Sequence, residues 1–143
     1  MHTHQSNNVP THNIDGQYIK EWLLLGPFFP DDLDTDFLAS AGGEANVNPC
    51  EGDAVTTSDG RTLRWKRHHS AEKAVDLIAA IGVHEYATAY AFCVLRNDSE
   101  GNGVISLGSD DGGAVWISGH RVHRNPKNRA LVEWHGLKVE IQL

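Results

Sequence analysis

The most informative stretch of the sequence is residues 108–122, which spell GSDDGGAVWISGHRV. The glycines around Asp110 and Asp111, together with Ser118-Gly119, predict two strands joined by an acidic turn and then a second, tight turn. The paired aspartates can hold a cation or a sugar hydroxyl. They can equally do no more than accept hydrogen bonds from the backbone N–H groups of the turn. Which of these holds decides whether the domain binds a ligand.

Short apolar or alternating runs outside this stretch predict further strands separated by turns. Between them lie two candidate helical segments, one turn within Pro30–Leu38 and a short helix at Ala71–Ile81, for which a strand and turn is the competing interpretation. The pattern predicts an all-β fold, an antiparallel β-sandwich with one or two short helical turns. The strands are expected at Tyr18–Phe28 (ended by Gly26-Pro27), Thr62–His68, Glu85–Leu95 (a central strand), Val104–Leu107, Val115–Ile117, Arg121–His123 and Lys138–Leu143.

The chain of 143 residues fits one domain. Residues 1–16 are polar and lack apolar periodicity, so we expect a disordered tail there and the β-sandwich domain over 17–143. His2 and His4 lie in that tail, which offers a metal no fixed geometry. The start carries neither a basic lead nor an apolar core, so no signal peptide is expected in this chain.

The net charge limits the classes of partner that the chain can bind, and the positions of the cysteines limit their chemistry. The formal net charge of −7 argues against a nucleic-acid partner, and no apolar run reaches the 18 residues typical of a membrane span. The two cysteines, Cys50 and Cys93, match no zinc spacing. Cys93 lies in an apolar run, which favours a buried free thiol, while a Cys50–Cys93 bridge stays open for an oxidising compartment.

Four segments together resemble a known family: WLLLGPF at 22–28, LDTDFL at 33–38, GGEA at 42–45 and the GSDDG hairpin. They are similar to a jelly-roll module of secreted multidomain bacterial proteins, related to galactose-binding-like domains and to the sugar-binding domain of family-2 glycoside hydrolases. The hairpin also resembles that of protective-antigen-type carbohydrate-binding domains. Such modules continue with a turn and a closing strand beyond the point matched by Leu143, so the last strand here is expected to lack a neighbour.

The resemblance implies a non-catalytic carbohydrate-binding module, extracellular or periplasmic, beside neighbouring domains of a parent protein and with a polysaccharide or glycan as ligand. In the yeast-adhesin branch a paired Asp-Asp holds calcium, and only Asp110 and Asp111 match that pair. Calcium takes about six to eight oxygen ligands, of which these carboxylates supply a part. Turn hydrogen bonding explains the same two residues.

The tryptophans divide into core and surface candidates. Trp22, Trp65 and Trp116 lie in apolar or alternating strands and are expected in the core. Trp134 lies in a loop-like stretch and is the candidate sugar platform. The aspartates at 31, 32, 34 and 36 lack the glycine and glutamate of a calcium-binding loop, so turn and cap roles are expected there.

Catalysis has little support in the sequence. Ser109, Asp110 and His120 do not form a nucleophile elbow, and the histidines do not follow a zinc-binding helix pattern. The chain is therefore predicted not to be an enzyme. The alternative to carbohydrate binding is a structural spacer or protein-interaction domain without a sugar ligand.

Overall fold

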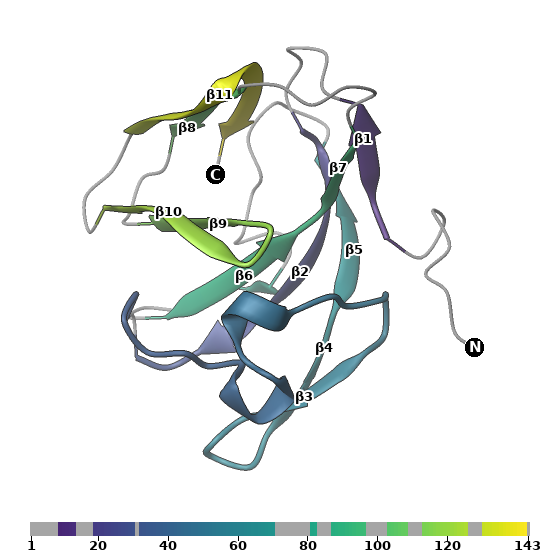
Figure 1. Cartoon of the computed structure of the whole chain (residues 1–143). Coiled ribbons are helices and arrows are strands. Elements are labelled where there is room, and N and C mark those ends of the chain that lie inside the picture. Colours follow the sequence, from purple (N-terminus) through teal and green to yellow (C-terminus); the bar gives the residue numbers. More distant parts are fainter. Residues whose placement is uncertain are drawn as a thin grey trace.

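The computed structural model of the chain describes residues 9–13, 19–30, 32–70, 81–82, 87–96, 103–108, 113–125 and 130–142. For residues 103–108, 123, 125 and 130–142 it describes the backbone alone. Strands dominate these residues, and most of the sheets that they form are antiparallel (Figure 1). The predicted all-β class is confirmed.

Eleven strands and two short 3-10 turns occupy the described residues. In chain order they are β1 (Thr11–Asn13), β2 (Glu21–Phe28), η1 (Ala39–Ala41), η2 (Glu44–Asn46), β3 (Ala54–Thr56), β4 (Thr62–Arg64), β5 (Lys66–His69), β6 (Thr88–Phe92), β7 (Val94–Arg96), β8 (Gly103–Gly108), β9 (Gly113–Ile117), β10 (His120–Asn125) and β11 (Ala130–Gln142). Apart from Ile81, the segment for which a helix was considered at Ala71–Ile81 lies outside the described residues.

The core is built on β2, the middle strand of the β5-β2-β6 sheet. Leu23, Leu25 and Phe28 of β2 are at most 2% exposed and pack with Leu38, Val55 and Trp65. Trp22 and Leu24, which alternate with them along the strand, are also buried. Both faces of β2 are thus covered, as its unbroken apolar run WLLL predicts.

The strand predicted at Tyr18–Phe28 runs from Glu21 to Phe28, so its predicted end is confirmed, and Gly26-Pro27 lies inside the strand just before that end. β5 pairs with β2 only as far as Leu24, so the proline nitrogen has no ladder partner to lose on that side. Toward β6 the register shifts between Leu25 and Phe28, which is a place where a sheet accepts proline.

The predicted strand Glu85–Leu95 is interrupted rather than continuous. β6 and β7 are separated at Cys93 and pair with different partners, β6 with β2 and β7 with β1. In the described part of its sheet β6 lies at the edge, so the prediction that it is central is wrong and β2 takes that place. The small side chain of Ala89 in β6 still allows β2 and β6 to lie close together. A Cβ added at Gly26 would lie 3.0 Å from the Cβ of Ala89.

The predicted polar tail is too long at its C-terminal end. Thr11–Asn13 form β1, parallel to β7, and Val9 and Pro10 before it are buried. The buried pair Val9 and Pro10 anchors this short strand. A strand of so few residues shows no periodicity in the sequence.

Both cysteines are free. Cys50 is buried, and burial raises the pKa of the Cys93 thiol to about 12. A thiol with such a pKa carries almost no thiolate at neutral pH and is a poor nucleophile. Cys93 is thus a free thiol, as the apolar run favours, but it is partly exposed, and Cys50 is the cysteine that is buried.

The stretch 108–122 folds differently from the two consecutive hairpins expected. β9 and β10 do form a tight hairpin across Ser118-Gly119, both of which have positive φ, as the sequence indicates. Among the described residues, however, β8 pairs with β11 and not with β9. The described strands before and after this segment, β8 and β9, therefore belong to different sheets.

The β9–β10 hairpin is docked on the segment 32–46, which carries both 3-10 turns. In Figure 1 it lies between the β8–β11 pair and these turns. The hairpin lies very close to segment 32–46 at Gly119, where an added Cβ would lie 2.6 Å from the carbonyl oxygen of Ala45. Only glycine leaves room for this contact, and φ of +80° at Gly119 independently favours glycine.

We expect Gly119→Ala to destabilise the protein more than Gly60→Ala does. Both glycines have strongly positive φ, but an added Cβ at Gly60 meets nothing within 4 Å. Gly60→Ala should therefore cost only the left-handed backbone penalty, about 1–2 kcal/mol. Denaturant unfolding of the two variants checks this, and equal losses would show that the hairpin does not rest on Ala45.

Candidate functional site

The structure describes only one of the three predicted site residues, Trp134, and for it only the backbone. Asp110 and Asp111 lie outside the described residues. Trp134 was predicted in a loop but belongs to β11, where its backbone lies opposite Gly103 of β8. The loop assignment is therefore wrong, and the choice of Trp134 as a sugar platform stays a prediction. Gly136, two residues further on, lies where the register of β11 against β8 shifts.

Among the three tryptophans whose side chains the structure describes, Trp116 of β9 is the exposed one. It is 37% exposed, whereas Trp22 and Trp65 are 5% and 2% exposed, so the core assignment is confirmed for those two and wrong for Trp116. The Val-Trp-Ile run indicates burial, but in the described residues β9 and β10 form a two-stranded ribbon of their own. Such a ribbon leaves part of one face in water.

Salt bridges join the hairpin to segment 32–46. Arg124 donates two hydrogen bonds to Asp34, from Nε to Oδ1 at 2.7 Å and from Nη2 to Oδ2 at 2.8 Å. Nη1 of Arg121 lies 3.7 Å from Oδ1 of the same carboxylate. We call Asp34, Glu44, Trp116, Arg121 and Arg124 the hairpin junction.

A β-bulge allows both arginines to reach one carboxylate. Residues three apart in a regular strand point to opposite faces. The register of β10 shifts between Arg121 and His123, which inserts one extra residue at Val122. Arg121 and Arg124 consequently share a side and converge on Asp34. No pattern in the sequence marks this bulge, so the junction was missed there.

Trp116 and Arg121 face each other across the hairpin. They are cross-strand partners, and the guanidinium carbon of Arg121 lies 6.0 Å from the centre of the indole ring. This is within the range of a cation–π contact. The contact holds the indole at the surface in a defined position.

Glu44 of the hairpin junction interacts with Tyr90 of β6. Partial burial raises the pKa of Glu44, the nearby Asp36 raises it further, and a hydrogen bond with Tyr90 and the charge of Arg121 act in the opposite direction. Burial, together with the charge of Glu44, raises the pKa of Tyr90. The Tyr90 hydroxyl also accepts a hydrogen bond from the N–H of Phe37, at 3.2 Å.

The aspartates of segment 32–46 mostly satisfy the backbone, as expected from the sequence. Asp32 accepts from the N–H of Asp34 and from the Thr35 hydroxyl, which lower its pKa. Asp36 accepts from the N–H groups of Leu38 and Glu44. These local bonds compete with helix formation, so the turns η1 and η2 begin after Leu38. Asp34 alone reaches across to the hairpin.

The junction therefore offers one exposed aromatic face beside fixed hydrogen-bonding groups of both signs. Such a surface can bind hydroxyl-bearing ligands. In the described residues no three His, Cys, Asp or Glu side chains lie together as a metal site would require.

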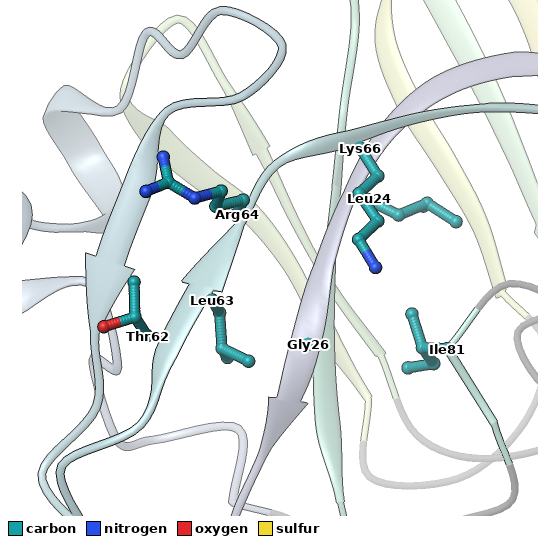
Figure 2. A pocket seen from close by; sticks show the side chains of 7 residues that line it. All are labelled: Leu24, Gly26, Thr62, Leu63, Arg64, Lys66 and Ile81. Carbon is teal, nitrogen blue, oxygen red and sulfur yellow. The ribbon is translucent and has the colours of Figure 1, made fainter.

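A pocket of about 400 Å³ lies on the other side of β2, away from the junction. It is lined by Leu24, Gly26, Thr62, Leu63, Arg64, Lys66 and Ile81 (Figure 2). Strands β2, β4 and β5 supply six of these residues. Its volume falls within the range of small-molecule sites.

Comparison with known proteins adds no relative: no family model, no curated protein and no solved structure matches the chain significantly. In the part of the chain that the structure describes, no helix is both long and apolar enough to cross a membrane.

We expect Glu44→Gln to stabilise the protein at neutral pH but not in acid. The folded-state pKa of Glu44 lies above its ordinary value, so folding becomes less favourable as the pH rises through that range and the carboxyl ionises. Below pH 4 the side chain is protonated in both states and the difference vanishes. Melting temperatures of both proteins from pH 3.5 to 7.5 measure this, and a parallel pair of curves would contradict it.

Proposed function

We propose that the chain is a non-catalytic carbohydrate-binding module, a β-sandwich of jelly-roll type that binds a glycan at the hairpin junction. The observation that carries the proposal is the exposed ring of Trp116, held by Arg121 beside Asp34 and Arg124. The proposal places the module outside the cell or in the periplasm, next to further domains of a parent protein, as the sequence resemblance implies.

The chemistry of the junction supports a sugar ligand. The apolar C–H face of a pyranose packs on the electron-rich face of an indole, while its hydroxyls need donors and acceptors at the rim. Arg121 offers N–H donors and Asp34 offers carboxylate oxygens within a few ångströms of each other. Because Asp34 and Glu44 lie near the two arginines, the charges largely offset, which suits uncharged hydroxyls better than an anionic sugar.

We expect Trp116→Ala to weaken glycan binding at least tenfold while leaving the melting temperature almost unchanged. An exposed ring contributes little to the core, but a stacked ligand loses its main apolar contact. Phe29→Ala is the matched control, because Phe29 is 45% exposed and also lies under a guanidinium, that of Arg61 at 5.2 Å. Glycan-array screening followed by calorimetry on the best binder gives the comparison. Equal binding by both variants would remove Trp116 from the site.

A second function is favoured by Val122. This residue is 37% exposed on the same hairpin as Trp116, so the hairpin also presents an apolar surface that a protein partner could cover. The two functions differ in one outcome. A protein-interaction domain would give no signal on any glycan, whereas the carbohydrate-binding module requires one that Trp116→Ala removes.

Calcium bound through Asp110 and Asp111 is a separate part of the proposal, carried by the resemblance of the GSDDG segment. We expect calcium to raise the melting temperature relative to EDTA, and Asp111→Ala to abolish that rise, because a ligand that binds only the folded state stabilises it. Thermal melting of both proteins in the two buffers measures this. An identical melting temperature of the unsubstituted protein with and without calcium would leave the two aspartates as turn residues.

A further inference from the structure

The pocket beside β2 combines an apolar interior with positive charge. Leu24 is 2% exposed and forms its wall together with Leu63 and Ile81. Arg64 and Lys66 are the charged residues among the described lining, and none of that lining is acidic. In a chain of net charge −7, a described lining with two cations and no carboxylate differs from the rest of the sequence.

The two cations do not play the same part. Nη1 of Arg64 donates a hydrogen bond of 2.9 Å to the carbonyl oxygen of Gly52, and Figure 2 shows its guanidinium directed away from Ile81. The ammonium of Lys66, in contrast, points into the space between Leu24, Gly26 and Ile81 in Figure 2. Lys66 forms no ion pair with any carboxylate of the described residues. Its charge is thus available to a ligand.

The backbone fixes this arrangement. Lys66 and Leu24 are directly opposite each other in the antiparallel pair of β5 and β2, so their side chains leave the sheet on the same face. Two residues along β2, Gly26 has no side chain, so Ala89 and Ile81 pack closely against the strand at the edge of the pocket. An added Cβ there would lie 3.0 Å from the Cβ of Ala89 and 3.4 Å from Cδ1 of Ile81.

We propose that this pocket binds a small amphiphilic anion, a carboxylate with an apolar tail. The carboxylate pairs with the ammonium of Lys66, and the tail lies along Leu24, Leu63 and Ile81. The pairing gives selectivity because the protein as a whole repels anions, so only the local field of the pocket can favour one. The proposal is independent of glycan binding at the hairpin junction, which lies on different strands.

The test is a titration of the whole chain with octanoate, followed by amide chemical shifts. Acetate, which lacks the tail, and 1-octanol, which lacks the charge, are the matched probes. Octanoate should shift the amide signals of Leu24, Gly26 and Lys66 and bind more tightly than either probe. Binding of 1-octanol as tight as that of octanoate, or octanoate shifts confined to other residues, would overturn the proposal.

Variants distinguish the contribution of the Lys66 charge to binding from that of the apolar cavity. Lys66→Gln should weaken octanoate binding about tenfold, the usual effect of losing a charge-assisted hydrogen bond, and leave 1-octanol unaffected. Lys20→Gln removes the same charge from an exposed position outside the pocket lining and should change neither. Lys66 is itself exposed, so its substitution should not unfold the protein. Unchanged octanoate affinity in Lys66→Gln would overturn the proposal.

Discussion

The burial of β2 on both faces determines how the described strands and segment 32–46 are arranged. One face carries Leu23, Leu25 and Phe28 into the core, and the other buries Trp22 and Leu24. A strand covered on both sides needs strands beside it and layers above and below it. This requirement places β5 and β6 next to β2, brings segment 32–46 against the core through Leu38, and leaves the small pocket at Gly26 on the opposite face.

The position of the β9–β10 hairpin follows from segment 32–46. Backbone contact at Gly119 and the salt bridges from Arg121 and Arg124 to Asp34 hold the ribbon against it. Exposed ion pairs contribute little to stability, typically below about 1 kcal/mol each. Their effect is orientation: the ribbon is fixed at one edge, and Trp116 is presented to solvent beside groups that hydrogen-bond.

The all-β class, the strand at Trp22–Leu25 and the tight turn at Ser118-Gly119 could be predicted because each has a local signal, an apolar run or a turn dipeptide. The exposure of Trp116 could not, because Val-Trp-Ile has the same pattern whether or not another sheet covers it. The convergence of Arg121 and Arg124 depends on a bulge, and the separation of β8 from β9 depends on pairing with β11. Both are non-local properties, which a single sequence does not encode in any short motif. Of the candidate site, only the neighbourhood of the hairpin was indicated by the sequence.

The indole N–H signals of the four tryptophans show directly whether a glycan binds at Trp116. Trp22 and Trp65 are buried and act as internal controls within the same spectrum. During titration with the best glycan from an array, the account predicts that the indole signal of Trp116 shifts in proportion to saturation while those of Trp22 and Trp65 stay in place. A saturable shift of another tryptophan with Trp116 unchanged would contradict it.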